Sequence, residues 1–264
     1  MARLFRLMVL GCLLWGTTAG ALAFDQEHAA WTRLLEKNVR WDTGGGATAV
    51  DYRALQAQRP ALDAYLAELA AVPADEFARW PWPQRQAFLI NAYNAGTVSL
   101  VLTGHPDIES IRDLGGFLRN PWRKAFVPLL GKTRSLDEIE HELLRGDPDY
   151  RDPRIHFAVN CASVGCPALR PDAYTAQRLE VQLADQTRRF LSDRSRNRYL
   201  AERRRFEVSP IFDWYPEDFT AGGGVTRFLL AQHAALGIDT AGLRGVKVES
   251  LSVAFTPYDW SLNQ

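Results

Sequence analysis

The stretch RIHFAVNCASVGCPALR, residues 154–170, gathers more reactive side chains than any other part of the chain. It contains Cys161 and Cys166, with His156 five residues before the first cysteine and Pro167 directly after the second. A functional site is therefore expected in this stretch, and the fold determines how its side chains are exposed.

The first part of this stretch predicts a short buried strand. Its apolar run, residues 155–159, is too brief for a helix and lies between a proline and a turn-forming Ser-Val-Gly sequence. Alternation along a strand would place His156 and Asn160 on one face and Cys161 on the other. The cysteines would then follow the end of the strand, where rigid scaffolds present functional groups. His156 and Cys161 are thus not partners by spacing alone.

The N-terminal residues have the pattern of a secretory signal peptide, predicted to cover residues 1–23. The first six residues include two arginines, an apolar run follows, and an Ala-Leu-Ala sequence ends at Ala23. Cleavage there would leave a mature chain that begins at Phe24, and the apolar run is too short to span a bilayer. We expect an exported protein, periplasmic or secreted. Cys12 offers an alternative lipid anchor, although too few apolar residues precede it for a normal signal core.

Composition narrows the class of protein. The 264 residues include 31 basic and 31 acidic side chains, so the formal charge gives no argument for a nucleic-acid partner or an anionic membrane. Hydrophobic residues make up 47% of the chain, which is ample for a core without disulfides. We predict a single domain over residues 24–264, without a transmembrane segment in the mature chain and without a cofactor. Its partner would be a small-molecule or peptide ligand of unknown identity.

The pattern along the chain predicts an α+β fold, with N-terminal helices around a buried central helix and a small, mostly antiparallel sheet. Residues 83–102 are apolar almost all round, as expected of the central helix. Ser135 and Glu138 form a capping box that opens another helix. Periodicity and turn signals place further helices at residues 25–38, 55–69, 174–192 and 226–235, a hairpin at 126–135, and strands at 206–209 and 246–255.

Two polar groups in the predicted helices are candidate site residues. Asn91 and Asn94 are three apart on one face of the central helix, and each buried amide without a partner would cost about 1–3 kcal/mol. They either bind neighbouring backbone or serve a site, and both alternatives stay open. Glu140 and His141 are adjacent, so in an α-helix they diverge by about 100° and cannot both face one site directly. His141 is better interpreted as a capping or packing residue than as a catalyst.

Several groups of residues are distinctive when taken together. They are FLINAYNA (88–95), IEH (139–141), RIHFAVNC (154–161) with CP (166–167), IFDWY (211–215) with DF (218–219), and YDWSLN (258–263). Jointly they resemble the domain-of-unknown-function 547 family over most of the mature chain. The resemblance implies a family found as exported bacterial proteins and as a C-terminal domain in larger plant proteins, with no established activity. The characteristic residues of the family that the resemblance implies in this chain are Asn91, Asn94, His141, His156, Cys161, Cys166 and Asp213.

The first functional hypothesis is a thiol-dependent hydrolase or acyltransferase. A cysteine nucleophile needs a base that lowers its pKa and a group that orients the base, and these partners can come from distant parts of the sequence. The local signatures of papain-like enzymes are absent around both cysteines. The candidates are Cys161 or Cys166 as nucleophile, His156 or His141 as base, and Asn91, Asn94 or Asp213 as orienter.

Two other chemistries fit the sequence less well. A redox dithiol typically has the spacing Cys-x-x-Cys, whereas four residues separate Cys161 and Cys166. Zinc accepts both histidine and cysteine, but His141, His156 and the two cysteines match no standard zinc spacing. We therefore predict no metal.

The alternative to an enzyme is a binding or scaffold domain with a local Cys161–Cys166 disulfide, which would stabilise the fold by roughly 2 kcal/mol. An enzyme predicts a pocket in which a reduced cysteine lies within hydrogen-bond reach of a histidine. A binding module predicts a bridged pair and a cleft lined by aromatic side chains. The aromatics in question are Trp214, Tyr215, Tyr258 and Trp260.

Overall fold

The computed structural model describes residues 23–115, 120–147, 150–239 and 244–264. The predicted signal peptide, apart from Ala23, and Cys12 lie outside the described residues.

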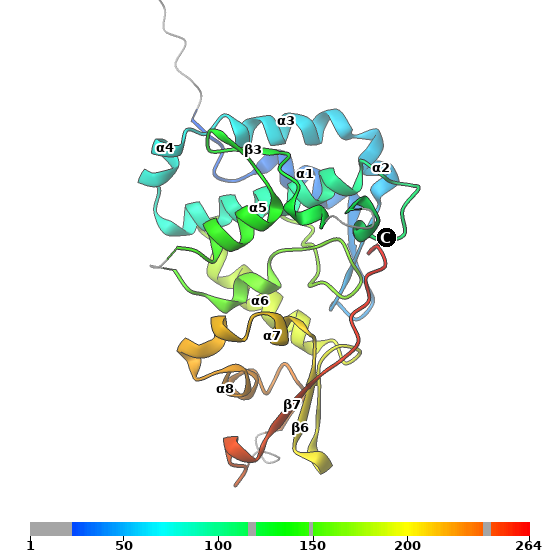
Figure 1. Ribbon diagram of the computed structural model, residues 1–264, viewed down its shortest axis with the longest axis vertical. Helices are drawn as coiled ribbons and strands as arrows, with labels where there is room; N and C mark the ends of the chain where they lie inside the picture. The colour runs from blue at the N-terminus through cyan, green and yellow to red at the C-terminus, as the bar shows by residue number, and fades with distance from the viewer. Residues whose placement is uncertain (1–22, 116–119, 148–149, 240–243) are drawn as a thin grey trace, which may run out of the picture.

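A layer of helices surrounds one buried helix at the N-terminal end of the molecule (Figure 1). The buried helix is α5 (Trp82–Val101), in which every residue from 86 to 101 is buried. The prediction of a central helix is therefore confirmed, and the reason is its apolar surface on all sides. The surrounding helices are α1 (Ala29–Asn38), α2 (Tyr52–Ala57), α3 (Arg59–Ala70) and α4 (Ala74–Arg79).

The helix expected at residues 55–69 is broken in two. Gln58 ends α2 and also precedes α3, whose second residue is Pro60. A proline at this position lacks an N–H and its ring would clash with the carbonyl four residues earlier, so one continuous helix is not formed. Asp51 caps α2 by accepting a hydrogen bond from the Ala54 N–H at 2.8 Å.

The strands form small sheets, which together with the helices confirm the α+β class. The predicted hairpin is present, and a three-stranded sheet lies at the opposite end of the molecule from α3 (Figure 1). In that sheet one pair of strands is antiparallel and the other is parallel. The antiparallel pairs are β1 (Val39–Trp41) with β2 (Thr48–Val50), β3 (Val127–Leu129) with β4 (Lys132–Arg134), and β5 (Arg198–Leu200) with β6 (Arg205–Val208); β7 (Ser252–Phe255) runs parallel to β6.

The expectation of a strand at residues 155–159 is wrong. The segment forms a 3-10 helix, η4 (Pro153–Phe157), in which the Asp152 carboxylate accepts the Arg154 N–H at 2.9 Å. An Asp cap followed by proline in the first turn is a signal for a helix start, and here it prevails over the apolar run. The alternation of faces expected for His156 and Cys161 therefore does not apply.

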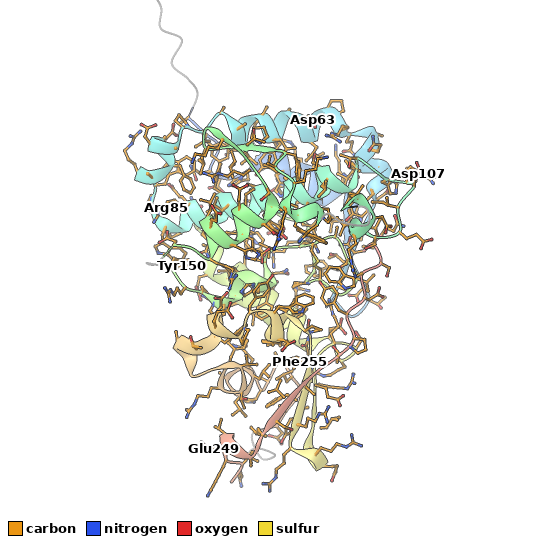
Figure 2. The ribbon with its side chains drawn as sticks, in the orientation of Figure 1. Asp63, Arg85, Asp107, Tyr150, Glu249 and Phe255 are labelled. Atoms are coloured by element: carbon orange, nitrogen blue, oxygen red, sulfur yellow. A yellow bond between two sulfur atoms is a disulfide. The ribbon has the colours of Figure 1, made fainter. Side chains whose placement is uncertain are left out.

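The 3-10 turn η4 joins two clusters of buried side chains. Ile155 packs in the larger cluster around α5, whereas Phe157 packs in a second cluster that includes Phe206. The second cluster lies among α6 (Leu179–Ser192), β6, α7 (Ile211–Trp214) and α8 (Val225–Ala231). In Figure 2, Asp63 on α3 marks one end of the molecule and Glu249 beyond the sheet marks the other.

Several predicted elements are shorter than expected, and α1 begins at Ala29 instead of residue 25. α6 begins at Leu179. The Gln182 side chain accepts the Thr175 N–H and donates to the Ala173 carbonyl, and these two bonds hold the preceding segment out of the helix. α8 ends at Ala231, and the expected strand at 246–255 is reduced to β7 after a 3-10 turn.

The C-terminal tail returns from the sheet to the helical layer and ends beside α2 (Figure 1). Its Asn263 carbonyl accepts the Val50 N–H at 2.8 Å, and its side chain accepts the Tyr52 hydroxyl at 2.7 Å. Leu262 pairs with Ser163 in an isolated bridge. The tail thus holds the cysteine segment against the rest of the molecule. Among the described residues, no helix has both the length and the apolar character needed to cross a bilayer.

Candidate functional site

A cavity of about 1220 Å³ collects side chains from segments that are far apart in the sequence. The cysteine segment, α7 and the tail each contribute to it, together with Tyr93 of α5. Three short helices complete the lining: η1 (Ile111–Gly115), η2 (Pro121–Arg123) and η3 (Glu138–Leu144). This cavity is the candidate functional site.

One wall of the cavity is aromatic. The ring centroids of Trp214 and Tyr258 lie 4.8 Å apart, those of Tyr258 and Trp260 lie 4.5 Å apart, and Trp122 lies 5.9 Å from Trp260. Tyr215 lines the cavity as well. Buried Ile211 and Phe212 anchor α7 in the second cluster, and Trp214 at the end of that helix stays 40% exposed. All four aromatic residues named for a binding cleft therefore meet in one cavity.

Cys161 and Cys166 form a disulfide that lines the same cavity. The Tyr258 hydroxyl lies 3.1 Å from the Cys161 sulfur and 3.3 Å from the Cys166 sulfur. Burial raises the pKa of Tyr258 to about 12, so its hydroxyl remains a donor at neutral pH. Ser163 Oγ is also 3.1 Å from the Cys161 sulfur. In this bridged form neither cysteine offers a thiolate.

The cysteine loop is packed closely against the tail. The Gly165 N–H donates to the Asp259 carbonyl at 2.8 Å, and a side chain at Gly165 would meet that carbonyl and the Tyr258 ring at 2.9 Å. Only glycine permits this approach without displacement of the tail. From the other side, buried Arg196 donates to the carbonyls of Val164 and Cys166. The position of Tyr258 over the disulfide follows from this packing.

Asn94 fixes the backbone that leads into the cysteines. Its amide donates to the Ala158 carbonyl at 3.0 Å and accepts the Asn160 N–H at 2.8 Å. Asn160 in turn accepts the Ala162 N–H and donates to the Pro167 carbonyl, which closes the loop across the disulfide. Ala162 adopts a φ of 63°, a left-handed conformation that this network stabilises.

Asn91 has the same kind of role at another segment. Its side chain donates to the Tyr174 carbonyl at 2.8 Å and accepts the Tyr174 N–H at 3.0 Å. Asn91 and Asn94 are both buried and lie outside the cavity lining, so of the two alternatives the structure shows backbone partners. Asp213 is exposed on α7 and also lies outside that lining, although its neighbour Trp214 belongs to it.

His156 is held between two carboxylates. Its Nε2 lies 2.6 Å from Asp218 Oδ2, its Nδ1 lies 3.9 Å from Glu140 Oε1, and the Tyr215 ring stacks on it with centroids 4.2 Å apart. Arg145 donates to the same Asp218 oxygen at 2.7 Å. The imidazole is therefore committed to acidic partners and not to Cys161.

Asp218 was not singled out from the sequence, yet it organises this cluster. Burial alone would raise its pKa, but hydrogen bonds from His156 and Arg145 outweigh burial and hold the pKa of Asp218 well below its usual range. Asp218 is thus ionised at neutral pH and accepts hydrogen bonds from the imidazole and from the guanidinium. It lies 62 residues from His156 in sequence, so no local pattern links the two.

Glu140 is a second residue that sequence reasoning missed. It is 7% exposed and lines the cavity together with Tyr93 and Tyr215. Burial, reinforced by the Glu140 carboxylate, raises the pKa of both tyrosines. Both hydroxyls therefore stay protonated at neutral pH.

The expectation that Glu140 and His141 cannot face one site is wrong, because both line the cavity. The predicted capping box is present, with Ser135 and Glu138 exchanging hydrogen bonds, but the helix that follows has π geometry. The Arg145 N–H bonds to the Glu140 carbonyl, five residues back, and the wider turn brings adjacent side chains to one side. His141 Nδ1 lies 3.0 Å from the Arg145 guanidinium. Such π turns occur frequently at functional sites.

The arrangement can bind a ligand against aromatic rings and can exchange hydrogen bonds with it through charged groups. In the described part of the chain, no cluster of three or more His, Cys, Asp or Glu side chains could hold a metal ion. The cysteines of the zinc hypothesis are engaged with each other in the disulfide.

Comparison with known proteins gives one match. No curated protein and no solved structure matches the chain. Residues 77–191 match the family described as Protein of unknown function, DUF547, and this region includes the central helix, the π turn and the cysteine segment. This match supports the assignment of the chain to the domain-of-unknown-function 547 family, which its sequence motifs had indicated.

Proposed function

We propose that the protein is a binding module that takes a small molecule or short peptide in the cavity. One observation carries the proposal: the Cys161–Cys166 disulfide and the aromatic side chains expected of a binding cleft line the same space. Ligand pockets characteristically combine aromatic walls with a few polar groups that orient the ligand. Here the polar groups include Glu140 and Arg112.

The contacts of the candidate catalytic residues also favour binding over catalysis. His156 is engaged by Asp218 and lies 3.9 Å from Glu140, while Asn91 and Asn94 take backbone partners. A nucleophile, base and orienter need to be in mutual hydrogen-bond reach. No such triad forms around the bridged cysteines in the described residues.

A thiol-dependent hydrolase or acyltransferase is the second candidate, and it requires reduction of the disulfide. The observation in its favour is that Cys161 lines the cavity with the Ser163 and Tyr258 hydroxyls 3.1 Å from its sulfur. A thiolate there would receive hydrogen bonds from both groups, and such donors lower a thiol pKa. His141 and His156 both line the cavity, and His141 is the candidate base because His156 is bonded to Asp218.

We further propose that the chain is exported to the periplasm or secreted. The signal-peptide pattern over residues 1–23 supports this, and a disulfide persists in such oxidising compartments. A binding module with a bridged pair would then work without any reductant.

The thiol state separates the two functions. The mature protein is purified from its exported compartment without reductant, alkylated with and without prior reduction, and analysed by mass spectrometry. A bridged Cys161–Cys166 pair that resists mild reduction supports the binding module. Two free cysteines, of which one alkylates much faster near neutral pH, would instead support the thiol enzyme.

Binding itself is tested by intrinsic tryptophan fluorescence against panels of oligosaccharides and tri- to hexapeptides. Trp214→Ala removes an aromatic ring from the cavity. Trp82→Ala is the matched control, because Trp82 is 38% exposed compared with 40% for Trp214 and lies outside this cavity. We expect a ligand whose affinity falls in Trp214→Ala and is retained in Trp82→Ala; equal loss in both variants would contradict the proposed site.

A further inference from the structure

We propose that the ligand of this cavity is a neutral carbohydrate longer than one sugar ring, an inference that rests on the proposed binding function. The sugar would lie with the C–H face of a ring against Trp214, Tyr258 and Trp260, and its hydroxyl groups would meet the charged side chains that line the same cavity. Each part of the cavity contributes to this inference.

The aromatic wall contributes three large rings to the cavity lining. Trp214 and Trp260 are nearly parallel, with 24° between their planes and 5.8 Å between their centroids, and the Tyr258 ring contacts both. Aromatic faces carry partial negative charge, and the C–H groups of a sugar ring carry partial positive charge. Stacking of one on the other buries the apolar face of the sugar and leaves its hydroxyls free at the edge.

A polar wall, formed by other residues of the cavity lining, supplies both donors and acceptors. Arg112, Asn120 and Arg123 donate, whereas Asp113 and Asp137 accept, and all five line the cavity. Because a hydroxyl group both donates and accepts, this mixed wall suits a ligand with many hydroxyls better than one with a single charged group.

Arg112 joins the two walls. Its guanidinium carbon lies 5.1 Å from the centroid of the Trp260 ring, and its side chain is exposed. Among the described residues, no carboxylate lies within ion-pair distance of Arg112, in contrast to Arg123, which pairs with Asp137 at 3.2 Å. Arg112 therefore has donors free for a group that stacks beside it on the aromatic wall.

The charge balance and the size of the cavity further narrow the class of ligand. Arg112 and Arg123 face Asp113, Asp137 and Glu140, so an anionic ligand such as a nucleotide would meet several carboxylates. A lipid chain would bury the charged wall without partners, which is costly. The volume of about 1220 Å³ exceeds the range of about 300–1,000 Å³ that is usual for small-ligand pockets. An oligosaccharide fits these conditions.

An extended peptide is the main competitor, and the backbone around the cavity disfavours it. The described lining residues come from helices, 3-10 turns and loops, and none belongs to a strand. Recognition of an extended peptide commonly uses the edge of a sheet for main-chain hydrogen bonds. The cavity offers side-chain donors and acceptors instead.

The test uses the labelled mature protein on two arrays, one of neutral oligosaccharides with α- and β-linked hexoses and N-acetylhexosamines, and one of short peptides. The strongest oligosaccharide is then titrated into wild type, Trp260→Ala, Trp214→Ala and the control Trp82→Ala. We expect the dissociation constant to rise about tenfold or more in each cavity variant and to stay unchanged in the control. Thermal unfolding of each variant confirms that the affinities are compared between folded proteins. Arg112→Gln provides a second probe that leaves the aromatic wall intact, and it should also weaken sugar binding.

The outcomes distinguish this inference from the proposed function. Peptide binding that depends on Trp214 and Trp260, with no oligosaccharide bound, overturns the carbohydrate inference and leaves the binding module standing. Absence of binding on both arrays overturns both proposals. Oligosaccharide binding that survives Trp214→Ala, Trp260→Ala and Arg112→Gln places the sugar elsewhere on the protein and overturns the inference as well.

Discussion

At the scale of single residues, Asp218 is the side chain on which the cluster behind the cavity depends. It accepts from His156 at 2.6 Å and from Arg145 at 2.7 Å, while the Tyr215 ring covers the imidazole. Without this carboxylate, the buried His156 ring and the partly buried Arg145 guanidinium would lack their shared partner. The position of Tyr215 in the cavity wall therefore depends on a residue that does not line the cavity.

Asp218→Asn is expected to lower the free energy of unfolding by about 2 kcal/mol at pH 7, because hydrogen bonds between charged groups are weakened. Since the pKa of Asp218 is held below its usual range, its contribution is present above about pH 4 and is lost as the pH falls further. Urea unfolding at pH 7 measures the change. Asp75→Asn is the control, since Asp75 pairs with Arg79 on an exposed surface, and no measurable loss is expected there. An unchanged free energy of unfolding in Asp218→Asn would show that the cluster does not stabilise the fold.

His28 should produce a separate pH dependence. Burial lowers its pKa to about 4, an effect that Asp25 offsets only in part, and its Nδ1 lies 2.7 Å from the Tyr65 hydroxyl. The unfolded chain binds a proton below about pH 6.5 whereas the folded protein keeps His28 neutral, so stability is full above pH 6.5 and falls as the pH decreases toward 4. The loss should reach about 3 kcal/mol, at about 1.4 kcal/mol for each pKa unit.

The measurement for His28 is the free energy of urea unfolding at intervals between pH 7 and pH 4. His28→Gln removes the titrating group and should flatten the curve over this range, even though the variant has a lower stability at pH 7. A slope that persists unchanged in His28→Gln would assign the effect to other groups.

At the scale of elements, the central helix α5 does more than fill the core. Two of its amides reach sideways to fix separate loops, Asn94 at the cysteine segment and Asn91 at Tyr174. The π turn η3 has a comparable effect, because it turns Glu140 and His141 toward one cavity. Both elements therefore determine where the residues of the site lie.

Asn94→Ala should loosen the cysteine loop. The Ala158 carbonyl and the Asn160 N–H would lose their partner, at a cost of about 1–3 kcal/mol for each buried group. We expect a lower free energy of unfolding and faster reduction of the disulfide by dithiothreitol. The reduction rate is measured by alkylation of the freed cysteines and mass spectrometry. Asn91→Ala is the matched control, since it also leaves two buried backbone groups unpaired but at Tyr174. Equal reduction rates in the two variants would contradict a local effect of Asn94 on the cysteine loop.

At the scale of the whole molecule, η4 and the C-terminal tail tie the helical layer to the sheet. Within η4, Ile155 packs in one cluster and Phe157 in the other, and Asn263 in the tail bonds to Val50 and Tyr52. The cavity lies among segments from both parts, so its shape depends on their association.

We predict that residues 24–264 unfold as one cooperative unit. Far-UV circular dichroism and tryptophan fluorescence should give coincident urea transitions, because neither cluster keeps its packing once η4 is lost. Phe157→Ala should lower the midpoint, with a loss of about 3–5 kcal/mol, and keep the two transitions coincident. Two separate transitions in the wild type would mean that the two clusters belong to independently folding domains.

The amino-acid sequence by itself determined the elements whose signals are local. Residues 83–102 have no polar face, so they had to form a buried helix, and Ser135 with Glu138 had to open the next one. The hairpin was likewise accessible from turn residues, whereas the sequence left the Cys161–Cys166 disulfide as an alternative to a free nucleophile. Each of these features depends on contacts between residues close in the chain.

Only the tertiary structure decided how the site is assembled. His156 meets Asp218 across 62 residues, and the aromatic wall joins Trp214 of α7 to Trp260 of the tail. The backbone conformation of residues 153–157 is a different case, because the Asp152 cap and Pro153 are a local helix signal that the apolar run obscured. Contacts between distant segments depend on the packing of the whole chain, and no local pattern records them.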